Sequence, residues 1–201
     1  MNKLPLPLQS LVDQLGMLPG VGPKSALRMA MTMLKWPQEK TRNLGQSILD
    51  LRDKLCICSG CSSLADSDPC EICADPARDS EKLCVVSEWD SLLVMEESGF
   101  FKGRYLVLGG LLSPLDGVDS NTLEFERLRK ILGNGQIKEL ILALGTTLES
   151  ETTGSYIKNM LVREFPKITL TRLAQGIPLG SDLKFMDKET LKQSMRYRQS
   201  I

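Results

Sequence analysis

Histidine is absent from this chain of 201 residues, and its absence narrows the chemistry open to the protein. Histidine is the side chain whose usual pKa lies nearest neutral pH, and it is the commonest nitrogen ligand for metal ions. Without it, the usual general base for catalysis near neutral pH is missing. Any zinc site must therefore use cysteine sulfur, with or without a carboxylate.

Long apolar runs are also missing. The chain has no stretch of about 18 apolar residues, the length that a membrane-spanning helix would need. The first residues, MNKLPLPLQSLVDQL, contain no long apolar core and no small-residue cleavage site, so we expect no signal peptide. The sequence therefore predicts a cytoplasmic protein, in which six cysteines favour metal binding over disulfides.

The chain also has no net formal charge, because its 25 basic and 25 acidic side chains cancel. This balance argues against a uniformly basic protein that coats nucleic acid. The local balance is different, since residues 1–45 hold six basic side chains and two acidic ones. We therefore expect the N-terminal part to be the part able to meet phosphate, while the acidic excess lies elsewhere.

Four of the cysteines form two C-x-x-C pairs separated by eight residues: Cys58 and Cys61, then Cys70 and Cys73. Each pair places two thiolates on one tight turn, at a spacing suited to tetrahedral zinc with Zn–S bonds of about 2.3 Å. Four sulfurs leave no position for water. We therefore expect one structural zinc per chain, which would supply folding energy to a segment poor in large apolar residues. Unbound thiols or a redox pair are the alternative.

The two remaining cysteines have different settings. Cys56 lies close enough in sequence to compete for a corner of the zinc site, and we treat it as a spare thiol. Cys84 falls within an apolar run, so we expect it to be a buried core residue.

The stretch LPGVGPKSA, which begins at Leu18, separates two helical patterns and predicts a helix-hairpin-helix. Gly20 and Gly22 permit backbone angles closed to other residues and allow a close approach to another backbone. The first amides of the following helix can face a phosphate, and Lys24 and Arg28 stand one turn apart on the same side. The pattern favours a sequence-independent contact to nucleic-acid backbone over its alternative, a purely structural turn with two solvated cations.

Residues 78–175 alternate short apolar runs with amphipathic stretches, which predicts an α/β fold with a mostly parallel sheet covered on both faces. Ligands of such sheets lie beyond the carboxyl ends of the strands. A short tail with one polar helix, 188–198, follows. The expected strands are 83–86, 105–108, 139–144 and 168–173, and the expected helices are 91–97, 121–132 (capped by Asn121 or Ser120) and 152–165.

Three carboxylates follow predicted strands: Glu88 after the first, and Glu149 and Glu151 after the third. Carboxylates at strand ends can hold magnesium for phosphoryl chemistry. Alternatively, they are ordinary exposed charges favoured near a helix N-terminus. No aspartate pair follows the third strand, where Gly145 and Thr146 stand, and no nucleophile is paired with a base. The sequence therefore predicts that the protein is not an enzyme.

The order and content of these motifs resemble the RecR family over nearly the whole chain. The stretches that carry the resemblance are LPGVGPKSALRMA (18–30), the cysteine quartet, CVV (84–86), GRYLVLGGLLSPLDGV (103–118), ELILAL (139–144), TLESETTGSYI (147–157) and TRLAQGIPLGSDLKFMDKETL (171–191). Two departures occur, because family members have Val-Val-Glu where this chain has Val86-Ser87-Glu88, and often Asn-Pro where it has Gly145-Thr146.

The resemblance implies a four-part organisation. A helix-hairpin-helix DNA-binding domain would span 1–54, a four-cysteine zinc finger 55–77, a Toprim α/β domain 78–175, and a tail that makes intersubunit contacts 176–201. It implies that Lys24 and Arg28 contact DNA and that the cysteine quartet binds zinc. It leaves Glu88, Glu149 and Glu151 as a partner contact or as remnants of the acidic Toprim residues.

The resemblance also implies a function. The protein would be a non-catalytic, clamp-like homodimer or homotetramer, associated with the nucleoid, that binds DNA without sequence preference. It would act with RecO, and in some settings RecF, to help RecA load onto gapped DNA coated with SSB. Two alternatives stay open: a Toprim-type magnesium-dependent nuclease or primase, and a zinc-stabilised adaptor that binds only protein.

Overall fold

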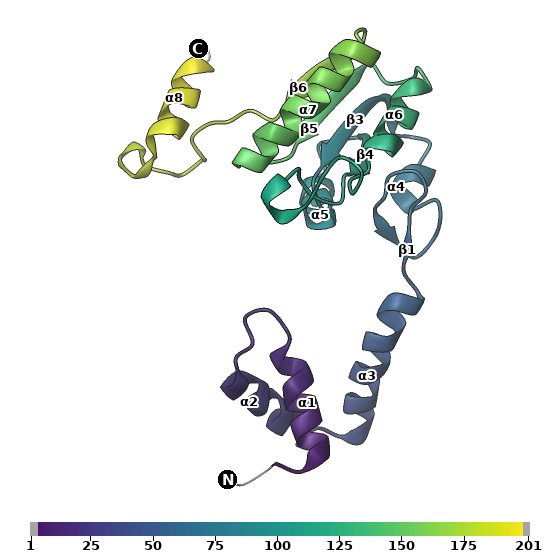
Figure 1. Cartoon of the computed structure of the whole chain (residues 1–201), viewed down its shortest axis with the longest axis vertical. Coiled ribbons are helices and arrows are strands. Elements are labelled where there is room, and N and C mark those ends of the chain that lie inside the picture. The colour runs from purple at the N-terminus through teal and green to yellow at the C-terminus, as the bar shows by residue number, and fades with distance from the viewer. Residues whose placement is uncertain (1–3, 199–201) are drawn as a thin grey trace. The chain divides into compact units, whose positions relative to one another are not determined.

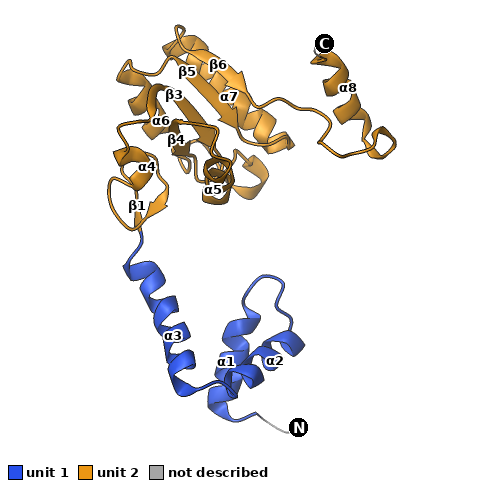
Figure 2. Cartoon of the chain, turned by 180° about the vertical axis from the view of Figure 1, so that it is seen from behind, with its two compact units in different colours: residues 1–55 blue, residues 56–201 orange. Residues whose placement is uncertain are grey.

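The structure, a computed structural model, describes residues 4–198 (Figure 1). The chain divides into two compact units, residues 1–55 and residues 56–201 (Figure 2). None of the helices described, from Leu6 to Arg196, combines the length and the apolar character that a membrane crossing requires.

The first unit consists of α1 (Leu6–Gly16), α2 (Pro23–Met33) and α3 (Gln38–Asp53). Helices α1 and α2 pack against each other through Val12, Ala26 and Ala30, which are buried. Two alanines at this contact allow a close approach of the helices, because neither side chain extends beyond Cβ. Larger side chains surround them, namely Leu8, Leu15, Val21 and Leu27.

The second unit is built on a four-stranded sheet in the order β4-β3-β5-β6, with every neighbouring pair parallel. Its strands are β3 (Asp79–Val86), β4 (Gly103–Val107), β5 (Glu139–Ala143) and β6 (Thr169–Arg172). The predicted α/β class with a parallel sheet is confirmed.

Helices cover both faces of this sheet, as predicted. Successive residues of β3 point to opposite faces, so Leu83 and Val85 join one core while Cys84 and Val86 join the other. On the second face, α5 (Trp89–Glu97) supplies the buried Leu92. On the first face, α6 (Phe125–Gly133) and α7 (Leu148–Glu164) supply most of the helical contacts. Cys84 is fully buried, which confirms its predicted place in the core.

Smaller elements flank the sheet. A two-stranded antiparallel ribbon, β1 (Cys56–Ile57) and β2 (Leu64–Ala65), is followed by the single-turn helix α4 (Glu71–Ala74). The 3-10 turns are η1 (Pro114–Asp116) and η2 (Leu183–Phe185), and the tail ends in α8 (Lys188–Arg196).

The start of α6 differs from the prediction. Neither Ser120 nor Asn121 caps this helix, which begins at Phe125. The Asp119 carboxylate instead accepts hydrogen bonds from the Asn121 and Thr122 amides at 2.8 and 3.2 Å. Aspartate commonly forms such local turns by bonding its own backbone two residues on, and the turn delays the helix.

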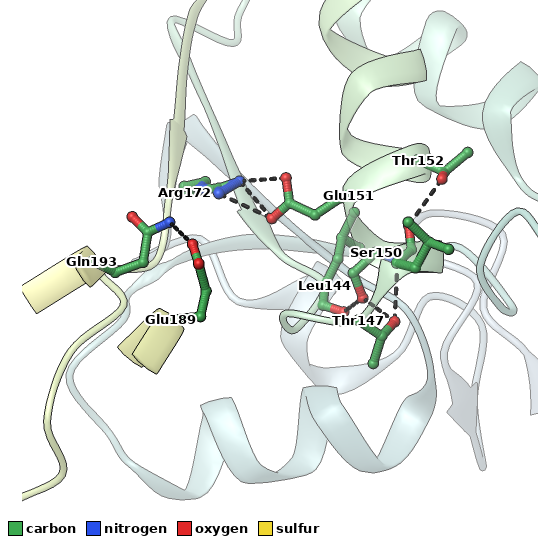
Figure 3. Close-up of polar contacts among 9 residues, drawn as sticks. Leu144, Thr147, Ser150, Glu151, Thr152, Arg172, Glu189 and Gln193 are labelled. Atoms are coloured by element: carbon green, nitrogen blue, oxygen red, sulfur yellow. Dashed lines mark hydrogen bonds and ion pairs between the residues drawn. The ribbon is translucent and has the colours of Figure 1, made fainter. Parts of the chain in front are cut away.

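Helix α7 also begins elsewhere than predicted, four residues earlier at Leu148. The Thr147 hydroxyl accepts a hydrogen bond from the Ser150 amide at 3.2 Å and so caps the helix (Figure 3). As a result Glu149 and Glu151 lie in the first turn of a helix, where the dipole favours acidic side chains.

Candidate metal centre and nucleic-acid interface

The two C-x-x-C pairs come together in one cluster. The sulfur atoms of Cys58, Cys61, Cys70 and Cys73 all lie within 4.8 Å of one another. The Cys61 and Cys70 sulfurs are 3.6 Å apart, near the edge of about 3.8 Å that a tetrahedron with Zn–S bonds of about 2.3 Å would have. Three of the four cysteines are buried and Cys73 is half-buried. The cluster could hold a metal ion.

Local backbone geometry shapes each half of the cluster. The Gly60 amide donates a hydrogen bond to the Cys58 sulfur at 3.4 Å, and the Cys70 amide donates to the same atom at 3.4 Å. Gly60 is also sterically required, because a Cβ there would lie 2.9 Å from the Cys73 sulfur. In the second half, Cys70 caps α4 by accepting from the Cys73 amide. These amide donors stabilise negative charge on sulfur.

The thiols differ in acidity. A hydrogen bond with the Cys73 thiol lowers the pKa of Cys61 to about 5, although burial opposes this shift. The same hydrogen bond, together with burial, raises the pKa of Cys73 above its usual range. The hydrogen bonds around Cys61 therefore favour its thiolate, which is the form that binds metal. Cys84 differs, since burial alone raises the pKa of its thiol to about 12.

Cys56 lies outside the cluster. It is half-buried in β1, opposite Ala65 of β2. The metal-competent group in the described residues contains four cysteines and not this one. Cys56, the predicted spare thiol, therefore serves as a control position for substitutions of the four clustered cysteines.

Contacts distant in sequence attach the cysteine segment to the sheet. The Arg127 guanidinium, on α6, donates to the Cys58 carbonyl at 3.1 Å and also to the Ser59 carbonyl. The Val107 amide, in β4, donates to the Cys61 carbonyl at 2.9 Å. Sequence reasoning missed Arg127, because no local spacing links it to a residue 69 positions away.

Asp68 joins the two halves of the cysteine segment. Its carboxylate accepts hydrogen bonds from the Ser59 amide and hydroxyl, both at 2.9 Å. These bonds, the backbone bond first, hold the pKa of Asp68 below its usual range.

The hairpin between α1 and α2 presents an open surface. Gly20 has φ +76°, a left-handed conformation that favours glycine. Gly22 precedes α2 with no side-chain cap, and Pro23 occupies the first turn. The first amides of a helix have no carbonyl partner within it. Within residues 4–198, and apart from each glycine's own chain neighbours, no heavy atom lies within 4 Å of the place that a Cβ would take at Gly20 or Gly22. The turn therefore leaves room for an external group.

Lys24 and Arg28 stand beside this turn, and both side chains are exposed. Neither forms an ion pair with any residue described between 4 and 198. The two cations are one helical turn apart, on the side predicted from their spacing. Their charge is available to an anion.

The three predicted strand-end carboxylates do not gather into a metal site in the described part of the chain, where the cysteines form the metal-competent group. Strand β3 ends at Val86, and Glu88 is the exposed residue that precedes α5. Glu149 is half-buried, and hydrogen bonds from its own amide and from Thr147 lower its pKa.

Glu151 is held by an arginine. Both of its oxygens accept from the Arg172 guanidinium of β6, with three contacts of 2.9 to 3.0 Å (Figure 3). A carboxylate engaged in such a bidentate pair has its oxygen atoms directed at the guanidinium rather than at a metal ion.

Comparison with known proteins accounts for nearly all of the chain. A family model described as "RecR, helix-hairpin-helix" matches residues 8–52, a Toprim domain model matches 81–174, and a "RecR, C-terminal" model matches 176–199. Proteins described as recombination protein RecR from Nitratidesulfovibrio vulgaris and Maridesulfovibrio salexigens are each 60% identical over 201 residues, covering all of both chains. The protein of that description from Acidothermus cellulolyticus is 41% identical over 194 residues, 96% of each chain.

Proposed function

This chain belongs to the RecR family of recombination proteins, and on that premise we propose that it is a non-catalytic mediator of recombination repair that grips DNA at the α1–α2 hairpin. The observation that supports this contact is that Lys24 and Arg28 are exposed and form no ion pair within residues 4–198, beside the open turn of Gly20 and Gly22. Amides and cations there would contact sugar-phosphate without reading bases.

The proposal includes one structural zinc per chain, held by Cys58, Cys61, Cys70 and Cys73. The donor set fits, because four sulfurs at mutual distances within 4.8 Å suit tetrahedral coordination. When bound, the zinc would cross-link the two C-x-x-C turns and leave no open position for a reacting group. The residues of this segment act by folding, not by chemistry on DNA.

The proposal assigns no catalytic residue. Its support is that Glu88, Glu149 and Glu151 form no metal-competent group within the described residues, together with the ion pair between Glu151 and Arg172. We regard these carboxylates as remnants of the Toprim acidic residues or as a contact for RecO. A magnesium-dependent nuclease or primase is the alternative, and metal-dependent cleavage that is lost in Glu149→Gln would establish it.

Partners and organisation complete the proposal. We keep the four-part division at 1–54, 55–77, 78–175 and 176–201. The protein would assemble as a clamp-like homodimer or homotetramer and act with RecO, and with RecF in some settings, to promote RecA loading on SSB-coated gaps. It would work in the cytoplasm at the nucleoid.

The function is tested by DNA binding and by RecA loading. We expect salt-sensitive binding to duplex and gapped DNA of any sequence, and faster RecA assembly on SSB-coated gapped DNA when RecO is also present. Fluorescence anisotropy measures the first and RecA-dependent ATP hydrolysis the second. Binding to RecO with no interaction with any DNA, alone or with RecO, would instead identify an adaptor that binds only protein.

An exposed apolar stripe on α3 supports self-association. No residue of α3 is buried in the structure as described, yet its Leu44, Ile48 and Leu51 follow one another at helical spacing, and Leu55 lies two residues beyond its end. Their exposed fractions are 36%, 64%, 61% and 37%. Contiguous apolar surface of this kind usually marks a protein interface.

This stripe yields a prediction about assembly. Ile48→Glu should weaken self-association by at least about tenfold, which corresponds to about 1.4 kcal/mol, because it places a charge in an apolar contact. Light scattering over a range of concentrations measures the change. Leu49→Glu is the matched control, since Leu49 is also 64% exposed but lies off the stripe. Equal masses for the two variants and the unsubstituted protein would contradict the assignment.

A further inference from the structure

A small cavity lies where the cysteine segment meets the sheet of the second unit. Its volume is about 250 Å³. Ser59 and Gly60 contribute to it from the first C-x-x-C turn, and the remaining lining comes from β4, from α6 and from the connection after α6. These lining residues are Arg104, Arg127, Lys130, Ile131, Asn134, Gln136 and Ile137.

The fold brings three cations of this cavity together from separate elements. Arg104 is the second residue of β4, and by strand alternation its side chain shares a face with Leu106, which belongs to the core under α6. Arg127 and Lys130 are one turn apart on α6. Asn134 and Gln136 add amide groups able to donate hydrogen bonds.

The charge in the cavity is only partly balanced. Arg127 is engaged, because its guanidinium pairs with Glu124 at 3.0 Å and also donates to the Cys58 and Ser59 carbonyls. Arg104 is exposed, Lys130 is exposed, and neither has an ion-pair partner within residues 4–198. Arg104 and Lys130 therefore line the same cavity without a carboxylate partner among residues 4–198.

The lining chemistry points to phosphate. Among the described residues that line this cavity there is no carboxylate and no aromatic ring. The four other cavities characterised in the molecule each include a carboxylate from Glu151 or Glu164. Cations and amides can hold a phosphate, and this cavity offers no aromatic ring on which a base would stack.

We propose that this cavity is a second site for a backbone phosphate of DNA, formed by Arg104 and Lys130 and shaped by Arg127. The inference rests on the proposed function and extends it, since it gives the cysteine and Toprim segments a direct DNA contact in addition to the hairpin. Arg127 is a positioning residue here, because it holds the Cys58–Ser59 backbone that forms one wall.

The test is the salt dependence of duplex binding by the full chain. Each phosphate contact contributes about −0.9 to the slope of log K against log salt. We therefore expect Arg104→Gln with Lys130→Gln to reduce the magnitude of the slope by about 1 unit and to weaken binding about tenfold at fixed salt. Arg127 is left intact, and unchanged zinc content and melting temperature show that the cysteine segment stays folded.

Arg163→Gln with Lys167→Gln is the matched control, because it removes one exposed arginine and one exposed lysine elsewhere in the same unit. It should leave the slope unchanged, and Arg104→Lys should retain most of the affinity. If the cavity variant keeps the salt slope of the unsubstituted protein while the Lys24 and Arg28 variant binds DNA weakly, the second site is refuted. The proposed function is not refuted by that result. If the unsubstituted protein binds no DNA, both fall.

A second experiment distinguishes a backbone phosphate of DNA from free phosphate as the ligand of this cavity. Crystals soaked in tungstate, a phosphate mimic, should show anomalous density beside Arg104 and Lys130, and this density should be absent in the double variant. Tungstate in the cavity together with an unchanged DNA slope would assign the cavity to free phosphate and refute a DNA contact.

Discussion

Cys70→Ser should abolish zinc binding and lower the melting temperature of the second unit by roughly 10 °C. Cys70 supplies one of four clustered sulfurs, and its loss leaves three. A ligand present at 1,000 times its dissociation constant stabilises a fold by about 4 kcal/mol, and each kcal/mol shifts the melting temperature by about 2–4 °C in a domain of this size. Loss of zinc should also destabilise the sheet, because hydrogen bonds from Arg127 and from the Val107 amide connect the cysteine segment to it.

Elemental analysis and calorimetry check this prediction. About one zinc per chain is expected for the unsubstituted protein, and chelation should reproduce the thermal loss. Cys56→Ser is the matched control, since it makes the same change in a half-buried cysteine outside the cluster. An intact melting temperature in protein that contains no metal would contradict the structural role, as would equal zinc loss in the Cys56 variant.

Lys24→Glu combined with Arg28→Glu should weaken DNA binding on the order of 100-fold near 0.1 M salt. The substitutions reverse two exposed charges, one in the first turn of α2 and one a turn further along. The variant should fold, because both side chains are exposed and because an acidic residue at position 24, in the first turn, is favoured by the helix dipole. Weaker DNA binding by the folded variant then shows that the hairpin contact to DNA has been lost. Anisotropy titrations at several salt concentrations measure affinity and slope together.

The control for this variant carries the same change in net charge. Lys35→Glu with Arg42→Glu alters two exposed cations of the same unit, beyond α2 and on α3. We expect the affinity for DNA to fall by less than about tenfold, because the change in net charge weakens only the long-range attraction to DNA. Similar losses in the two double variants would mean that total charge, and not the hairpin, governs binding. Undiminished affinity in the Lys24 and Arg28 variant would refute the hairpin contact.

Several features of the molecule could be predicted from the sequence because they depend on neighbours along the chain. A C-x-x-C turn closes over three peptide bonds, so its spacing alone predicts two sulfurs on one side. The glycine turn before α2 and the cations one and five residues after Pro23 are similarly local. Alternation of apolar runs with amphipathic stretches was enough to predict a parallel sheet covered on both faces.

Helix starts were less predictable. Ser120 and Asn121 are suitable cap residues by type, yet Asp119 forms a turn with the amides that follow it, and α6 starts at Phe125. At α7 the cap is Thr147, a residue type equally suited to loops and strands. Several residue types can satisfy the same free amides, so composition leaves a choice that the neighbouring chain decides.

Spacing over a few residues or periodic burial was enough to predict the cysteine quartet, the basic hairpin and the α/β class. Three other arrangements become visible only in the folded chain: the hydrogen bond from Arg127 to the Cys58 carbonyl, the ion pair between Arg172 and Glu151, and the cavity shared by Arg104 and Lys130. These pairs lie 21 to 69 residues apart, and their meeting depends on the strand order β4-β3-β5-β6. A charge is visible in the sequence, but its partner is set by the packing of distant elements.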